Sequence, residues 1–283
     1  MANENVRLRF LAMERSLRAT GCKLPLLVIP YDDNLFDLPE GSSWWEVPEI
    51  TNWLKAEKAH PVMRKYQCLT VENYQFFDSD IVILRNPETV LSSNQGFITS
   101  CGHWHNIKHT CTDASKRWIL KKSTNWQRLV FNTGQFACDR TLYEVDQLIE
   151  TAMNPEVVET CVHCPHHEQP GLNWLVWLSG VEITNLTLPP FNMESTWAGD
   201  YPEDYKRYWS DPQRHPYLIH WAGTRMDVPR PINQIFYDFL TTDEKAEWDA
   251  QVNAKSIQRR KESRSPKSVA RRLKHALNTL VEA

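Results

Sequence analysis

The chain has 283 residues, a formal net charge of −3, 41% hydrophobic residues and 24% charged residues. This length and composition allow a full apolar core and exclude an intrinsically disordered protein. The near-neutral charge argues against nucleic acid as the main partner. Seven cysteines, an odd number, indicate reduced thiols rather than a disulfide framework.

The elements expected in chain order follow from hydrophobic periodicity and from turn residues. The expected helices cover residues 5–19, 50–59, 61–70, 141–153, 169–178 and 231–240. The expected strands cover residues 24–29, 76–84, 96–100, 134–138 and 181–186, with a loop at 44–48. Helices alternating with strands predict an α/β fold with a mostly parallel sheet flanked by helices.

The domain organisation is predicted from a change in composition near the end of the chain. Residues 1–250 are expected to form the main domain, and residues 251–283 a basic helical tail with apolar side chains spaced along 268–283. Such a tail suits either peripheral contact with an anionic membrane or a solvated helix. The start of the chain lacks the apolar run of a secretory signal, and no segment has the length of a membrane span, so we expect a cytoplasmic protein.

The strongest chemical signal is the triplet Asp78-Ser79-Asp80 at the end of an apolar run. Two carboxylates one residue apart at the end of a strand can face one divalent cation, and Mg²⁺ and Mn²⁺ both prefer oxygen ligands. Such a cation can stabilise charge on a departing diphosphate. The alternative is a solvated turn without a metal.

Four segments in order resemble those of GT-A glycosyltransferases, the glycogenin-like and lipopolysaccharide-type retaining enzymes in particular. They are Phe76-Phe77-Asp78-Ser79-Asp80, Phe131-Asn132-Thr133-Gly134, Glu168-Gln169-Pro170-Gly171-Leu172-Asn173 and Ile219-His220-Trp221-Ala222-Gly223. The resemblance covers roughly residues 5–240. It implies a Rossmann-like GT-A domain that moves a hexose from a nucleotide-diphosphate sugar, with UDP favoured, to a glycan or a lipid-linked hydroxyl.

The resemblance also implies roles for individual residues. Asp78, Asp80 and His220 would bind the metal, for which an imidazole beside two carboxylates favours Mn²⁺ over Mg²⁺. Gln169 and Glu168 would lie at the reacting face. The expected donor- or substrate-binding residues are Asp78, Asn132, Gly134, Asn173, Gly223, Arg225 and Lys65, with Arg64 as an alternative to Lys65 for phosphate.

Three departures from the family pattern stand out. Met226 takes the place of a phosphate-binding lysine, with Arg225 one residue earlier as a possible substitute, and Glu168 takes the place of an aspartate. The chain also starts directly in what reads as the helix after the first strand, so the first strand of the fold is expected to be missing.

Two short windows are rich in cysteine and histidine. They contain Cys101, His103, His105, His109 and Cys111, and Cys161, His163, Cys164, His166 and His167. Thiolates and imidazoles at this density are compatible with a structural Zn²⁺, although the spacing matches no established pattern. Alternatively, these residues and Trp104 line an acceptor pocket. The chain has twelve tryptophans, which suit stacking on sugar rings as well as core packing.

Two other functions are compatible with these residues. One is a non-enzymatic module that binds carbohydrate, either stabilised by zinc or derived from a transferase that has lost activity. The other is a phosphatase of the haloacid-dehalogenase type, in which the first Asp of an Asp-x-Asp triplet is a nucleophile. The run Ile81-Val82-Ile83 after the triplet argues against the phosphatase.

Overall fold

The computed structural model describes residues 1–104, 109–164, 167–226 and 228–263. The helices are α1 (Arg7–Ala19), α2 (Pro48–Ala56), α3 (Pro87–Leu91), α4 (Asp113–Lys122), α5 (Val145–Ala152), α6 (Val158–Cys161), α7 (Gln169–Ser179), α8 (Asn233–Tyr237) and α9 (Thr242–Ser263). The strands are β1 (Leu26–Val28), β2 (Ser42–Trp44), β3 (Tyr74–Phe77), β4 (Ile81–Ile83), β5 (Phe97–Thr99), β6 (Gln135–Cys138), β7 (Ile183–Asn185) and β8 (Leu218–His220).

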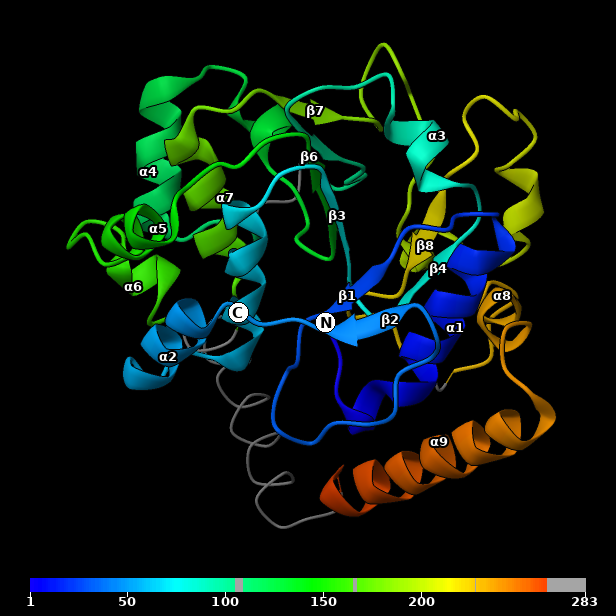
Figure 1. Cartoon of the computed structure of the whole chain (residues 1–283). Helices are drawn as coiled ribbons and strands as arrows, with labels where there is room; N and C mark the ends of the chain where they lie inside the picture. Colours follow the sequence, from blue (N-terminus) through cyan, green and yellow to red (C-terminus); the bar gives the residue numbers. More distant parts are fainter. Residues whose placement is uncertain (105–108, 165–166, 227, 264–283) are drawn as a thin grey trace, which may run out of the picture.

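The strands form three small sheets of mixed direction. One sheet has four strands in the order β3-β6-β5-β7, and β1-β2 and β4-β8 form two-stranded sheets. The pairs β1-β2 and β5-β7 are parallel, whereas β3-β6, β5-β6 and β4-β8 are antiparallel. Figure 1 shows α4 to α7 gathered on one side of the four-stranded sheet, and α1 and α8 on the other side beside β4 and β8.

The prediction of an α/β fold is confirmed, but the prediction of one mostly parallel sheet is not. Hydrophobic periodicity reports whether a segment is a helix or a strand, whereas strand direction depends on which distant segments pair. The expected strand at 76–84 is two strands, broken at residues 78–80, and the expected helix at 61–70 is a 3₁₀ helix over Pro61–Thr70. Helix α4 was not expected, although Thr112 and Ser115 form a capping box at its start.

The start of the chain lies against the segment that directly follows β1. Ala2 forms an isolated parallel bridge with Pro30, donating its N–H to the Ile29 carbonyl at 3.0 Å and accepting from the Tyr31 N–H at 2.9 Å. The first strand of the structure is β1, which follows α1, in agreement with the expected order.

Helix α1 connects the strands to the end of the described chain. On its inner side, the Ser16 hydroxyl accepts a hydrogen bond from the Ile83 N–H of β4 at 2.9 Å. On its outer side, Arg7 and Arg15 form ion pairs with Glu247 and Glu244 of α9 at 2.7 and 2.5 Å. These ion pairs hold α9 against α1.

The predicted division at residue 250 falls inside α9, which runs without a break from 242 to 263. The apolar stripe expected at 268–283 lies outside the described residues. Among the helices that the structure describes, none is long and apolar enough to cross a membrane.

Candidate metal centre

Asp78 and Asp80 lie in the short turn between β3 and β4. The turn is anchored at both ends: the Asp78 N–H donates to the Gly134 carbonyl at 2.7 Å, and the Trp221 N–H donates to the Asp80 carbonyl at 3.0 Å. The Ser79 side chain between them is buried. Because strands β3 and β4 belong to different sheets, the turn places the two carboxylates where the sheets meet.

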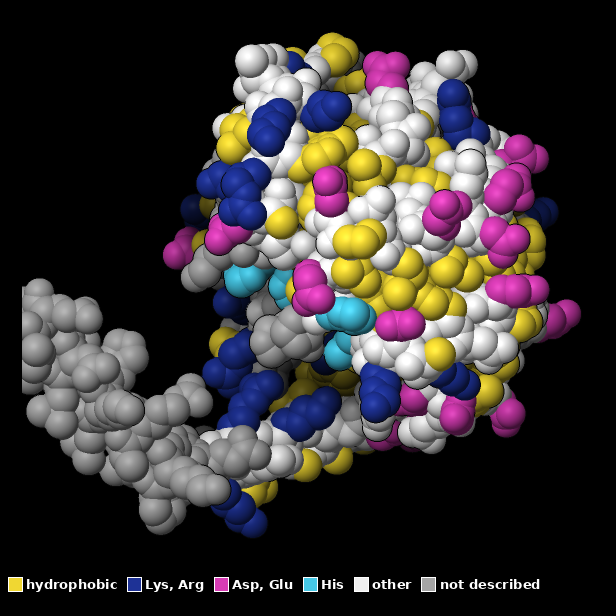
Figure 2. Space-filling model, turned by 90° about the vertical axis from the view of Figure 1, so that its left-hand side faces the viewer, with side chains coloured by type: hydrophobic (Ala, Val, Ile, Leu, Met, Phe, Trp, Pro, Cys, Tyr) yellow, Lys and Arg dark blue, Asp and Glu magenta, His cyan; other side chains and the backbone are white. Residues whose placement is uncertain are grey.

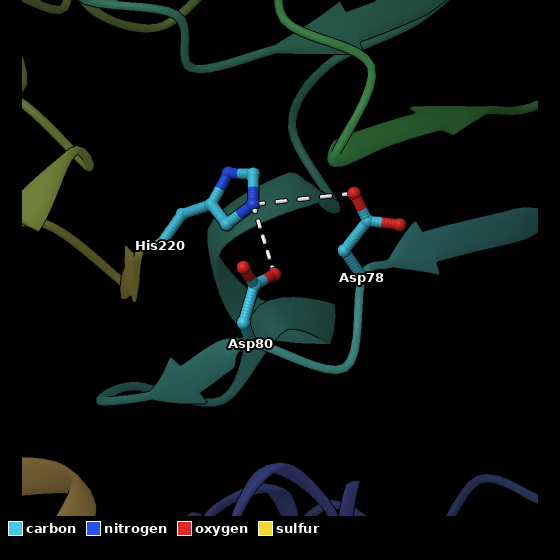
Figure 3. A group of neighbouring side chains, drawn as sticks. All are labelled: Asp78, Asp80 and His220. Carbon is cyan, nitrogen blue, oxygen red and sulfur yellow. Dashed lines mark ion pairs between the residues drawn. The ribbon is translucent and has the colours of Figure 1, made fainter. Parts of the chain in front are cut away.

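The third member of the cluster is His220, the last residue of β8. Antiparallel pairing of β4 with β8 puts His220 directly opposite Ile81, the residue after Asp80. Its Nε2 lies 3.2 Å from Asp80 Oδ1 and 4.0 Å from Asp78 Oδ2. Figure 3 shows the His220 ring directed toward both carboxylates. Asp78, Asp80 and His220 each offer a ligand atom, and these atoms all lie within 4.8 Å of one another.

This donor set fits a divalent metal ion. Two carboxylates and one imidazole provide three of the ligands of an octahedral ion such as Mn²⁺, and the remaining positions would be open to water or phosphate. The expectation that these three residues come together to form a site that can hold a metal is confirmed. The identity of the ion remains a prediction.

The absence of a side chain at Gly134 leaves room for the His220 ring. A Cβ atom at position 134 would lie 2.0 Å from His220 Cε1, far inside van der Waals contact. A glycine is therefore required beside the imidazole. The family resemblance implies that Gly134 borders the sugar, and this stays a prediction; in the structure Gly134 lies against a metal-ligand candidate.

The charges in the cluster favour the ionised forms of Asp80 and His220. Burial alone would raise the pKa of Asp80, but the charge and hydrogen bond of His220 outweigh it and hold the pKa at about 2. Burial alone would lower the pKa of His220, but the two carboxylates raise it above its usual value. The cluster thus stabilises positive charge between Asp78 and Asp80, whether that charge is a proton on His220 or a cation.

Lys65 is buried behind the cluster and bridges two carboxylates. Its Nζ lies 3.2 Å from Asp78 Oδ1 and 2.6 Å from Glu168 Oε1, and it donates to the Thr133 carbonyl at 3.3 Å. Burial would lower the pKa of Lys65, but the two carboxylates raise it. Asp78 therefore turns one oxygen to Lys65 and the other to His220.

The expected role of Lys65 as a phosphate ligand does not agree with this geometry, because its side chain is 1% exposed and already bound to carboxylates. Glu168 is buried as well, and it also accepts from the Thr133 hydroxyl at 2.5 Å. Burial would raise its pKa, but Lys65 lowers it. We conclude that Lys65 and Glu168 position Asp78 and the 131–134 turn.

Asn132 and Gln169 are joined by hydrogen bonds next to this network, and we call this pair the Asn132–Gln169 clasp. The Asn132 amide donates to Gln169 Oε1 at 2.9 Å, and the Thr133 N–H donates to the same oxygen at 3.2 Å. Asn132 Oδ1 accepts from the Gly134 N–H at 2.9 Å. Two segments that the sequence selected separately thus form one hydrogen-bonded unit.

The other expected site residues have different positions. Asn173 is fully buried, and its side chain bonds the N–H and the carbonyl of Phe131 at 3.0 and 2.9 Å. Arg64 is buried and donates to the Pro30 carbonyl at 3.0 Å. Gly223 and Arg225 lie exposed in the turn after β8, three and five positions beyond His220.

No family model and no curated protein matches this chain.

An aromatic side chain that the motifs did not select lies beside the cluster. Trp197 forms an isolated parallel bridge with His220, and its indole N–H donates to the Ala222 carbonyl at 2.7 Å. The His103 ring lies 4.7 Å from the Trp197 ring and 2.9 Å from Asp200 Oδ2. The high tryptophan count was the one sequence signal that pointed to such a residue.

The cysteine and histidine windows meet at His109 and His167, whose rings lie 6.4 Å apart, but among the described residues they bring together no group of three metal ligands. His103 pairs with Asp200, His163 pairs with Glu57 and Glu159, and Cys101 and Cys161 are buried free thiols. The predicted ligands His105 and His166 lie outside the described residues. Figure 2 shows histidine side chains gathered near the middle of the face that carries α2, α5 and α6. Structural Zn²⁺ remains a prediction.

Proposed function

We propose that this chain is a divalent-metal-dependent glycosyltransferase of the GT-A type. It would transfer a hexose from a nucleotide-diphosphate sugar, UDP-linked by preference, to a hydroxyl of a glycan or of a lipid-linked acceptor. The proposal combines the order of the four family-like segments with the contacts that bring all four together in the structure.

One observation carries the proposal. Asp78, Asp80 and His220 are up to 142 positions apart in the numbering, yet their ligand atoms lie within 4.8 Å of one another. The Asn132–Gln169 clasp is tied to the same cluster, because the Gly134 carbonyl accepts from the Asp78 N–H. A solvated Asp-x-Asp turn would need none of these long-range contacts.

In this proposal, some residues of the chain bind the cation and another residue positions one of these ligands. A cation held by Asp78, Asp80 and His220 would supply Lewis acidity toward a diphosphate leaving group. Lys65 holds Oδ1 of Asp78 at 3.2 Å and so directs Oδ2 toward the cation site. Lys65 acts through Asp78 and is therefore a positioning residue.

In this proposal, an aromatic side chain and a pair of amide side chains contact the sugar. Trp197 is half-buried and pairs with His220 through its backbone, and an indole at this position suits stacking on a pyranose ring. The Asn132–Gln169 clasp offers amide groups for sugar hydroxyls. Arg225, exposed beyond β8, is our candidate for the diphosphate, since a guanidinium binds phosphate oxygens in pairs.

The test is calorimetric titration of UDP and of GDP into the full chain, with and without Mn²⁺. We expect binding of one nucleotide to require Mn²⁺ and to be lost in the variant Asp80→Ala. The matched control is Asp146→Ala, which removes an exposed aspartate of α5 and should leave binding unchanged.

Two outcomes would contradict the proposal. Nucleotide binding that is equally strong without metal, or that survives Asp80→Ala, would separate the nucleotide site from the carboxylate cluster. Tight zinc in the purified protein together with no nucleotide binding would favour the non-enzymatic carbohydrate-binding module.

A further inference from the structure

An apolar cavity of about 670 Å³ lies between strands β1 and β3. Residues 26–29, which include β1, and residues 74–77, which form β3, line it. In Figure 1, β1 and the N-terminus lie beside one end of β3. The cavity is therefore bordered by the edges of two strands that belong to different sheets.

On the edge of β1 that faces away from β2, the backbone groups of Leu27 have no hydrogen bond to another described residue. Leu26 donates its N–H to the Gly41 carbonyl, and the Val28 carbonyl accepts from Trp45, so both residues point toward β2. In a parallel ladder, the backbone groups of alternate residues point to opposite neighbours. The N–H and C=O of Leu27 therefore point away from β2.

A ladder already begins on that edge. Ile29 and Tyr31 also point away from β2, and there Ala2 bonds to both of them. The bridge is parallel. A strand lying beside Leu27 and running toward Ala2 would extend this ladder with no change of direction.

The edge of β3 that faces away from β6 is arranged in the same way. The Asp78 N–H bonds to the Gly134 carbonyl, and the antiparallel register then makes Phe76 bond to Phe136. Residues between such pairs direct their N–H and C=O to the opposite edge. The backbone groups of Gln75 and Phe77 therefore point away from β6, on the side where the cavity lies.

Most side chains around the cavity are apolar, as around a buried central strand, although Glu72, Glu88 and Asp139 also line it. The lining residues that also belong to the core include Phe10, Met13, Leu17, Phe76, Phe77 and Ile98. A strand that is covered on both faces carries apolar side chains at successive positions rather than alternate ones. The lining thus selects an occupant without charges over about four residues.

We propose that this cavity binds one extended apolar peptide strand, which runs parallel to β1 and joins β1 and β3 into a continuous sheet. The backbone edges favour a peptide over a hydrocarbon chain, because a peptide supplies an N–H and a C=O to each side and a hydrocarbon supplies neither. The inference is independent of the glycosyltransferase proposal, because it uses none of the metal-ligating side chains.

The test uses the full chain and the peptide acetyl-Lys-Val-Ile-Val-Ile-Lys-amide. At a hundredfold excess over its Kd, we expect the peptide to raise the thermal midpoint by about 5 °C. The same peptide with alternate amides N-methylated keeps its side chains and should bind about tenfold more weakly or worse. Bound peptide should also slow hydrogen exchange at the amides of Leu27 and Phe77.

A pair of variants locates the binding. Leu27→Glu places a charge at a half-exposed lining position and should abolish the midpoint shift. Leu35→Glu changes a similarly exposed leucine that does not line the cavity and should leave the shift unchanged. Joining the peptide directly before Met1 provides a second arm with high effective concentration, and this protein should melt higher than the parent.

Three results would overturn the proposal. One is the absence of any shift both with the free peptide and with the joined segment. Another is equal stabilisation by dodecanoate and by the N-methylated peptide, which would make the cavity a general apolar pocket. The third is a concentration-dependent dimer that Leu27→Glu dissociates, which would assign the cavity to a second copy of the chain.

Discussion

Replacing Lys65 by methionine tests the buried network behind the metal centre. The Lys65 ammonium is 1% exposed and lies 2.6 Å from Glu168 and 3.2 Å from Asp78. Methionine fills a similar volume but leaves Glu168 buried without a counter-charge. Removing one partner of a buried ion pair costs about 3–5 kcal/mol, and we expect Lys65→Met to lower the free energy of unfolding by that amount.

The loss should depend on pH with a defined sign. In the parent protein, Lys65 lowers the pKa of Glu168, so Glu168 contributes stability at pH values above its unfolded pKa, and this is lost as pH falls. In Lys65→Met, burial without the lysine should raise the pKa of Glu168, so that stability falls as pH rises through it. The difference between the two proteins should therefore be larger at pH 7 than at pH 4.

The double variant Lys65→Met/Glu168→Gln separates stability from positioning. It removes one positive and one negative charge, so the net charge near the metal centre is unchanged. We expect its stability to recover to within about 1 kcal/mol of the parent. Its Mn²⁺ affinity should remain about 10- to 100-fold lower, because Asp78 has lost the group that orients it.

Urea unfolding measures the stability of these proteins, and calorimetry measures their Mn²⁺ affinity. Lys55→Met, which removes an exposed lysine of α2, is the control and should change stability by less than about 0.5 kcal/mol. A cost below 1 kcal/mol for Lys65→Met would refute the buried-pair reasoning. Full Mn²⁺ affinity in the double variant would refute the positioning role of Lys65.

Two further predictions concern the packing of the centre and the attachment of α9. Gly134→Ala should lower stability by about 1–3 kcal/mol and weaken Mn²⁺ binding, because the new Cβ would overlap the His220 ring. Gly223→Ala, at φ 63° but with open space around its Cβ, should cost only about 1 kcal/mol and leave metal binding intact. The hydrogen bonds of Arg15 lower the pKa of Glu244 to about 2 from its usual 4.5. Glu244→Gln should therefore cost about 1 kcal/mol at pH 7, after allowance for solvent screening, and progressively less as pH falls from 4.5 toward 2, as urea unfolding at a series of pH values would show.

Local pattern was sufficient to predict most of the elements and two of the three metal-ligand candidates. The helix at α1 and the strands near β1, β5, β6 and β7 follow from short-range periodicity, which is a property of neighbouring residues. Asp78 and Asp80 were recognisable because their chemistry depends on a spacing of two positions. His220 was found through its resemblance to a family segment rather than through spacing.

Contacts between distant segments decided the rest. The pairing of β4 with β8 brings His220 to Asp80. Lys65 was expected to bind phosphate, but it is buried and paired with Glu168, so that it positions Asp78 instead. Sequence spacing does not encode these contacts. The role of a charged side chain depends on how deeply it is buried and on which distant groups lie beside it and neutralise its charge. The residue types at the centre were therefore determined by the sequence, and the partner of each was decided by the tertiary structure.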